Sequence, residues 1–93
     1  IYLLCFLDRI DDYSNFAYPP RDGRKRCVFA TRSPRRPNPI SLTRARVQSI
    51  KDNIITVSGL DMLDQTPLID IKPYTEKTPE DASFGWVEKY MDD

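Results

Sequence analysis

The 93-residue sequence predicts an all-β fold, a small and mostly antiparallel β-barrel with a short C-terminal docking segment. Short runs rich in β-branched and aromatic residues recur along the chain, and turn-forming residues separate them. No long amphipathic helical pattern is present. Four or five short strands with turn-rich links are typical of small barrels and sandwiches.

Five segments are expected to be strands. The first, IYLLCFL, is a nearly continuous apolar run, as in a buried strand. The run at 40–50 alternates apolar and polar residues, and the turn Lys51-Asp52-Asn53 returns the chain into IITVSGL as a hairpin partner. The expected strands are residues 1–7, 27–32, 40–50, 54–60 and 67–72.

The chain is expected to form one domain over residues 1–93, because its length suits one modest core. Ile1 lies inside a strand-like run, so N-terminal strands of the domain are expected to be missing from the sequence. Residues 8–26 contain few apolar side chains and predict a long exposed loop. The segment SFGWVEKYM at 83–91 predicts a short helix or a docking segment that uses its aromatic residues.

Charge is distributed unevenly along a chain whose net charge is zero. Residues 21–46 carry nine basic side chains against Asp22 alone, a net charge of +8, between two acidic segments. This pattern predicts a local patch for a polyanion, or else pairing between the two halves of the chain. On the first interpretation, the residues expected to bind RNA are Arg21, Arg24, Arg35 and Arg36.

Several classes of protein are disfavoured by composition. The chain has no histidine, the commonest metal ligand and general base, and no cysteine spacing typical of a metal site. Cys5 and Cys27 lie in apolar runs and are expected to be free thiols, as is usual in the cytoplasm. No apolar stretch approaches the roughly 20 residues of a membrane span, so we expect neither a metal nor a membrane partner.

The most informative stretch is VFATRSPRRPNPISLT at 28–43. Its three prolines fix φ and restrict the residues before them, so the loop is expected to be stiff. Its three arginines have planar side chains that suit phosphate and carboxylate groups. The loop is therefore either a preorganised site for an anionic ligand or an ordinary proline-rich crossover between strands.

A second candidate region is the strand PLIDIKPY at 67–74. Asp70 and Lys72 are two residues apart and should project from the same face of the strand. They form either a structural ion pair on an exposed sheet face or the wall of a polar pocket that ends in Pro73-Tyr74. No glycine-rich phosphate loop and no Ser/His/Asp set occurs in the sequence.

Two blocks, FATRSPRRPNPISLT (29–43) and GLDMLDQTPLIDIKPY (59–74), resemble the signatures of the TsaA/TrmO-type family. The resemblance covers residues 1 to about 74 and implies an S-adenosylmethionine-dependent β-barrel tRNA methyltransferase that forms homodimers. Its implied substrate is threonylcarbamoyladenosine beside the anticodon. The sequence has Ser41 and Gln65 where the family usually has glycine.

The resemblance implies a cofactor site between the 32–42 loop and the 68–74 strand. Methyl transfer from a sulfonium needs positioning more than acid–base power. The acidic N–H of the substrate needs one proton acceptor, for which Asp70 or Tyr74 is expected, with Lys72 holding the substrate's carboxylate. The residues expected to bind the cofactor are Arg32, Pro37, Asn38, Leu68, Ile69 and Asp70.

Two other interpretations remain open from the sequence. The +8 segment is sufficient for a non-catalytic RNA-binding module, particularly with aromatic residues near the first loop. An aromatic tail at Phe84, Trp86 and Tyr90 is also consistent with a homodimeric interaction domain.

Overall fold

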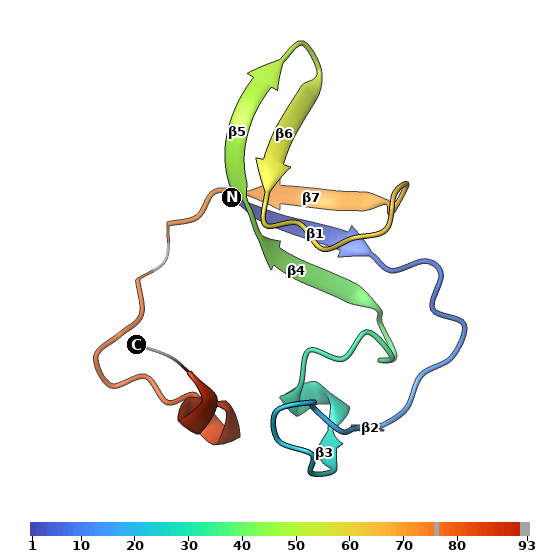
Figure 1. The fold of residues 1–93 in the computed structure, drawn as a ribbon, viewed down its shortest axis with the longest axis vertical. Coiled ribbons are helices and arrows are strands. Elements are labelled where there is room, and N and C mark those ends of the chain that lie inside the picture. Colours follow the sequence, from blue (N-terminus) through green and yellow to red (C-terminus); the bar gives the residue numbers. More distant parts are fainter. Residues whose placement is uncertain (76, 92–93) are drawn as a thin grey trace.

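The computed structural model describes residues 1–75 and 77–91, and in this part of the chain the fold is all-β with two short 3-10 helices. Figure 1 shows a central sheet with a hairpin at one end and a small strand pair at the other. The elements in chain order are β1 (Tyr2–Phe6), β2 (Phe16–Ala17), β3 (Arg26–Cys27), η1 (Val28–Ala30), β4 (Ile40–Arg44), β5 (Arg46–Lys51), β6 (Ile54–Ser58), β7 (Leu68–Lys72) and η2 (Gly85–Tyr90).

The central sheet has the order β4-β1-β7, and both strand pairs are antiparallel. The middle strand, β1, has the most continuously apolar sequence, as expected for a strand with neighbours on both sides. Its residues Leu3 and Cys5 point to the inner face and are buried with Ala45. Ile1, Val57 and Met62 pack against them, so the core lies between the sheet and the β5–β6 hairpin.

The predicted strand at 40–50 is divided at Ala45 into β4 and β5, which belong to different sheets. Ala45 is buried, and it exchanges two backbone hydrogen bonds of 2.9 Å with Ile1. A small side chain fits this buried corner. The hairpin between the 40–50 and 54–60 runs is confirmed as β5–β6, closed by Asp52 and Asn53.

The predicted strand at 27–32 is wrong beyond Cys27, because the chain turns into η1 instead. The backbone N–H and the hydroxyl of Thr31 both donate to the Val28 carbonyl, at 3.0 and 2.8 Å. These local bonds compete with a sheet ladder. Val28 is fully buried, whereas Cys27 is exposed and does not pack as a buried apolar residue.

Among residues 1–75 and 77–91, the three sheets do not join into a closed barrel. The outer edges of β4 and β7 have no strand beside them in the described chain. The molecule measures 45 × 38 × 18 Å, with a radius of gyration of 15.3 Å against roughly 12 Å for a compact domain of this length. Its accessible surface is 7856 Å², whereas a folded monomer of 10.8 kDa is expected to expose roughly 5500 Å². The mostly antiparallel all-β class is confirmed, but the fold is open.

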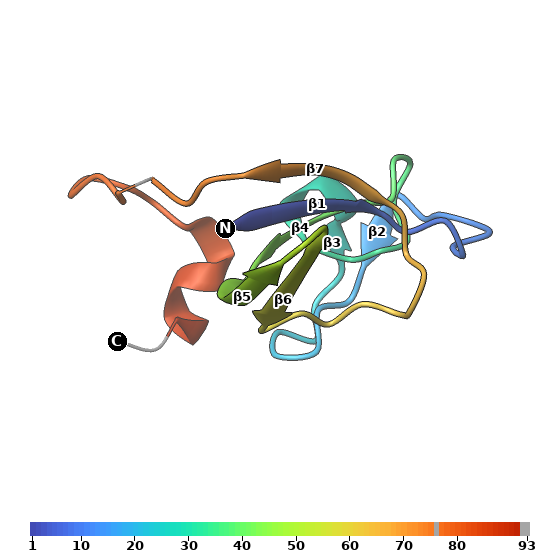
Figure 2. The same ribbon diagram turned by 90° about the horizontal axis from the view of Figure 1, so that it is seen from above.

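The C-terminal segment returns to the loops near β2 and β3, as Figures 1 and 2 show. Its 3-10 helix, η2, confirms the expected short helix within 83–91. The Trp86 indole N–H donates to the Ala30 carbonyl at 2.9 Å, and the Arg21 guanidinium donates to the Tyr90 carbonyl at 2.7 Å. The segment therefore docks through Trp86 and Tyr90, as expected. Residues 76, 92 and 93 of the expected domain lie outside the described residues.

Candidate functional site

The outer face of the central sheet carries most of the chemistry predicted for β7. The register places Tyr2 of β1 between Arg44 of β4 and Lys72 of β7. One step along the same face, Leu4 lies between Leu42 and Asp70. Polar and apolar groups therefore share one exposed surface of the sheet.

Asp70 and Lys72 form an exposed ion pair, with 3.1 Å between carboxylate oxygen and ammonium nitrogen. The hydrogen bond from Lys72 lowers the pKa of Asp70, and a 2.8 Å bond from the Ile71 N–H lowers it further. The prediction that the two side chains share a face is confirmed. A carboxylate with a lowered pKa stays ionised and is a weaker base, so this environment favours holding a polar or cationic group over removing a proton.

Tyr74 lies just beyond β7 and contacts two side chains of the neighbouring strands. The Arg44 guanidinium stacks 5.4 Å from the Tyr74 ring centre and donates to its hydroxyl at 3.3 Å. The Tyr2 ring meets it edge-on at 5.4 Å. Sequence reasoning missed Arg44, because its position opposite Tyr2 depends on a strand register that the sequence does not specify.

The proline-rich loop is held by its own hydrogen bonds. Arg36 donates to the Thr31 carbonyl at 2.8 Å, so one of its expected ligand-binding donors is used within the loop. Pro37 and Asn38 are exposed, and no side-chain hydrogen bond of Asn38 occurs among the described residues. The Pro39 carbonyl accepts from the Leu7 N–H at 2.7 Å, which fixes the end of the loop to β1.

The loop and β7 meet at only one end of the sheet. Pro39 is bonded to Leu7, and Pro67 accepts from Phe6 at 2.9 Å, so the loop end and the start of β7 both lie beside the end of β1. Leu68 and Ile69, each 52% exposed, are therefore the β7 residues at the end of the sheet where the loop ends. Lys72, four residues further along the strand, lies about 13 Å away from Leu68. Asn38 and Leu68 therefore lie at the same end of the sheet, on opposite sides of β1, whereas Lys72 lies toward the other end.

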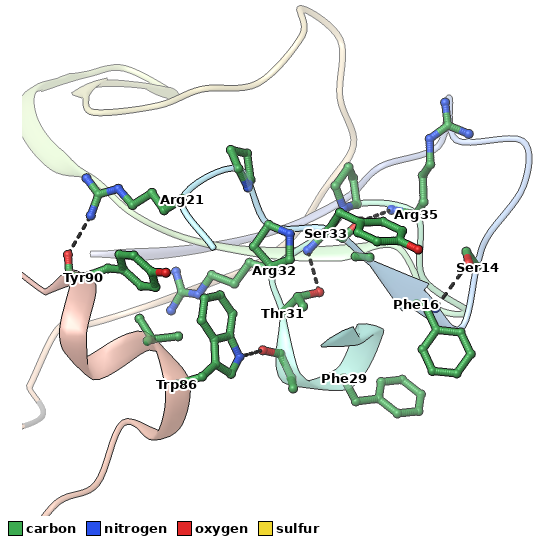
Figure 3. A pocket seen from close by; sticks show the side chains of 17 residues that line it. Ser14, Phe16, Arg21, Phe29, Thr31, Arg32, Ser33, Arg35, Trp86 and Tyr90 are labelled. Atoms are coloured by element: carbon green, nitrogen blue, oxygen red, sulfur yellow. Dashed lines mark hydrogen bonds between the residues drawn. The ribbon is translucent and has the colours of Figure 1, made fainter. Parts of the chain in front are cut away.

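A cavity lies between the loops and the docked C-terminal segment, and we call it the loop–tail pocket. It has a volume of about 880 Å³, and Figure 3 shows side chains from both segments around it. Aromatic residues of the loops and of η2 make much of its lining. The lining includes the aromatic residues Phe16, Phe29, Trp86 and Tyr90 and the basic residues Arg21 and Arg32.

Two of the four arginines predicted to bind RNA line this pocket, together with Arg32 of the predicted cofactor set. Arg21 and Arg35 lie on its wall, and Arg35 also pairs with Asp12 at 2.5 Å on the surface. Arg24 is exposed in the preceding turn and does not line the pocket. Arg36 faces its own loop and stacks 6.0 Å from the ring centre of Phe29.

Asp22, the single acid of the basic segment, anchors the pocket. Its carboxylate accepts from Arg26 at 2.8 Å and from the Tyr90 hydroxyl at 3.1 Å, and its side chain is inaccessible to solvent. The hydrogen bond from Arg26 lowers the pKa of Asp22. Sequence reasoning noted Asp22 only as a charge. Its spacing of four residues from Arg26 was the one local signal of this pair.

A second cavity of about 620 Å³ lies on the inner face of the sheet, beside the 60–66 turn. Leu68 lines it, together with core residues Leu3 and Cys5. Neither this cavity nor the loop–tail pocket is lined by both the 32–38 loop and Asp70. The described residues contain no group of three or more side chains suited to a metal ion. Nor do they include a helix long and apolar enough to cross a membrane.

Comparison with known proteins shows the family. Over 91 residues the chain is 41% identical to a probable S-adenosyl-L-methionine-binding protein of Archaeoglobus fulgidus, a match that covers 96% of this chain and 25% of that protein. It is 49% identical over 77 residues to a tRNA (adenine(37)-N6)-methyltransferase of Eikenella corrodens, covering 74% of this chain and 43% of the relative.

A human tRNA (adenine(37)-N6)-methyltransferase is 53% identical over 57 residues, which are 60% of this chain and 13% of that protein. The chain thus spans less than half the length of each of these three relatives. Residues 1–80 match the family model of the tRNA-methyltransferase O N-terminal domain, and the chain belongs to that family.

Proposed function

We propose that this chain is the catalytic domain of an S-adenosylmethionine-dependent tRNA methyltransferase. The observation that carries the proposal is the family match over residues 1–80, together with relatives whose names specify S-adenosylmethionine binding or methylation of adenine 37. We further propose that the methylated nucleotide is threonylcarbamoyladenosine beside the anticodon. The reaction belongs to the cytoplasm, where free thiols such as Cys5 and Cys27 are usual.

The proposed cofactor site is where the proline-rich loop meets the start of β7. Ile69 exposes apolar surface that can cover an adenine ring, whereas Leu68 faces the inner cavity beside Cys5. The Asn38 amide offers both a donor and an acceptor. Pro37 belongs to the same stiff loop, whereas Arg32 of the predicted cofactor set lines the loop–tail pocket and is not part of this proposed site. Asp70 is ionised and suits a ribose hydroxyl or an ammonium group. These residues fit S-adenosylmethionine, which supplies an electrophilic methyl group when bound.

The nucleotide that accepts the methyl group is proposed to contact Asp70, Lys72 and Tyr74. Lys72 presents an exposed ammonium that can hold a substrate carboxylate, at the cost of its pairing with Asp70. Tyr74 carries a hydroxyl that accepts a hydrogen bond from Arg44 at 3.3 Å, and we propose it as the alternative proton acceptor to Asp70. The lowered pKa of Asp70 favours a binding role for that carboxylate.

The test is methyl transfer from radiolabelled S-adenosylmethionine to anticodon stem-loops. We expect label in a stem-loop that carries threonylcarbamoyladenosine and much less in the same stem-loop with unmodified adenosine. Asn38→Ala and Asp70→Ala should lower turnover far more than the melting temperature, since both side chains are exposed. Stem-loop binding without calorimetric binding of S-adenosylmethionine would instead favour a non-catalytic RNA-binding module.

A homodimer is also proposed, and the open surface of the chain supports it. The accessible area exceeds that of a typical folded monomer of this mass by roughly 2300 Å², and a standard interface buries about 800 Å² per partner. Phe6, Ile40 and Leu42 form an exposed apolar group on the outer face of the sheet. Strands added by a second copy at the edges of β4 or β7 are our proposed route to barrel closure. A strictly monomeric, fully active species in light scattering would contradict this.

A further inference from the structure

The loop–tail pocket has aromatic side chains on two opposing segments of the chain. Phe16 and Phe29 come from the loops and are 49% and 72% exposed, which is unusual for rings that have only a packing role. Trp86 and Tyr90 come from η2 and are half-buried. Figure 3 shows Phe16 and Phe29 at one end of the pocket and Trp86 and Tyr90 at the other. A cation lies over one face of each ring: Lys25 over Phe16, Arg36 over Phe29, Arg26 over Trp86 and Lys89 over Tyr90. A planar ligand would stack on the opposite faces.

Arginine side chains lie among these rings. Arg21 and Arg32 line the same pocket, and one guanidinium nitrogen of Arg21 donates to the Tyr90 carbonyl. Within residues 1–75 and 77–91, Arg32 makes no side-chain hydrogen bond or ion pair. The acid nearest to these groups in the sequence, Asp22, is already held by Arg26 and Tyr90. Among the described residues no acidic side chain lines the pocket, so the positive charge of Arg32 is not neutralised within it.

The pocket is also preorganised. The indole N–H of Trp86 is fixed on the Ala30 carbonyl at 2.9 Å, and the Arg26 guanidinium stacks 5.0 Å from the indole ring centre. The Tyr90 hydroxyl is fixed on Asp22 at 3.1 Å. Side chains that are already ordered lose little entropy when a ligand binds.

We propose that the loop–tail pocket binds an unstacked nucleotide of a single-stranded RNA loop. Its base stacks among Phe29, Trp86 and their neighbours, and its phosphate lies on Arg21 and Arg32. Aromatic platforms beside arginine donors are how proteins hold splayed-out bases of RNA loops. An apolar peptide could pack against the same rings, but it would leave the arginines without a negative partner. The volume of about 880 Å³ is within the range of small-ligand sites.

This inference rests on the proposed function, but it assigns a separate place. The pocket is lined by segments 14–21, 29–35 and 86–90, none of which includes β7 and its proposed catalytic residues. Trp86 and Tyr90 also lie beyond the residues that match the family model, 1–80. The nucleotide held here is therefore proposed to be one that positions the RNA, outside the site of methyl transfer.

Trp86 provides the readout, because it is the only tryptophan of the chain. Its fluorescence is titrated with an unmodified anticodon stem-loop, with a fully paired RNA duplex and with S-adenosylmethionine alone, so no methyl transfer is needed. We expect saturable quenching by the stem-loop and little by the duplex. Phe29→Leu should weaken stem-loop binding about 5- to 100-fold, the range for loss of one base–aromatic stack. The control Ile50→Ala, at an apolar residue of the β5–β6 hairpin that is 69% exposed and lies outside the pocket, should leave affinity unchanged.

A second variant tests the phosphate contact without touching a ring. Arg32→Gln should weaken binding and lower the slope of log affinity against log salt by about 1. Equal affinities of the Phe29→Leu and Ile50→Ala variants would overturn the proposal, as would stem-loop binding without Trp86 quenching. Saturable quenching by S-adenosylmethionine that displaces the stem-loop would make the pocket a cofactor site and refute it equally. Stem-loop quenching in a protein that transfers no methyl group would leave the pocket standing and reject the proposed function.

Discussion

Replacing Gln65 with glycine should stabilise the fold. The Thr66 N–H and hydroxyl both donate to the Leu63 carbonyl, at 3.2 and 2.6 Å, which closes a turn over residues 63–66. Gln65 is the third residue of this turn and has a φ of 67°. A positive φ at that position is typical of a type II turn, which favours glycine. For a residue with a Cβ, left-handed backbone costs about 1–2 kcal/mol.

The greater freedom of glycine in the unfolded chain offsets about 0.5–1 kcal/mol of the stability gained by relieving this backbone strain. The net effect of Gln65→Gly is thus about 0.5–1 kcal/mol of added stability, a rise in melting temperature of roughly 2–8 °C for a domain of this size. Thermal unfolding followed by circular dichroism measures it.

The matched control is Ser41→Gly, at the other position where the resembled family usually has glycine. Ser41 lies in β4 opposite Cys5, in extended backbone. Glycine there should destabilise the domain by about 0.5–1 kcal/mol, because it adds only unfolded-state entropy. If Gln65→Gly lowers the melting temperature as Ser41→Gly does, the turn is not strained and the reasoning fails.

Three further outcomes are expected. Asp22 has a lowered pKa in the folded protein, so the stability that its ionised form gives is full above the ordinary carboxyl pKa of about 3.9 and is lost as the pH falls through the lowered value. Trp86 fluorescence should report the C-terminal segment detaching over that acid range, and Asp22→Asn should abolish this pH dependence. Arg35→Glu should weaken tRNA binding and flatten its salt dependence with little change in melting temperature. Arg36→Glu should in addition lower the melting temperature, because Arg36 donates to the Thr31 carbonyl; equal melting temperatures of the two variants would contradict this. Asp70→Ala should leave thermal stability nearly unchanged, because an exposed ion pair contributes little, and a clear drop would make Asp70 structural.

The sequence predicted those features that depend on neighbouring residues. The hairpin between the 40–50 and 54–60 runs follows from the turn residues at 51–53, and the shared face of Asp70 and Lys72 follows from the two-residue period of strands. The strand at 27–32 failed because Thr31 can bond the Val28 carbonyl with both its N–H and its hydroxyl. Propensity counts Thr31 as a strand former and does not include that competition.

The contacts that define the candidate site are long-range, and the sequence could not supply them. Arg44 meets Tyr74 across two strand pairings, and Trp86 reaches Ala30 over 56 residues. The aromatic tail was expected to dock, because its apolar residues have no other core to join. Its destination depends on the carbonyl left free where η1 replaces the expected strand. The error at 27–32 and the missed pocket therefore have the same physical cause.

The proline-rich loop connects the two proposed sites. Its first half, Thr31–Arg35, lines the loop–tail pocket, and its second half ends at Pro39, which is bonded to β1 beside the start of β7. Arg36 ties the loop to itself between these halves. A stiff connection of this kind holds an RNA nucleotide and a methyl donor at a fixed separation, and such preorganised proximity is the main contribution a protein makes to a displacement reaction. Replacing Pro37 by glycine should therefore lower turnover on the stem-loop more than it weakens binding of either ligand measured alone. Equal losses in turnover and binding would show that the two halves act independently.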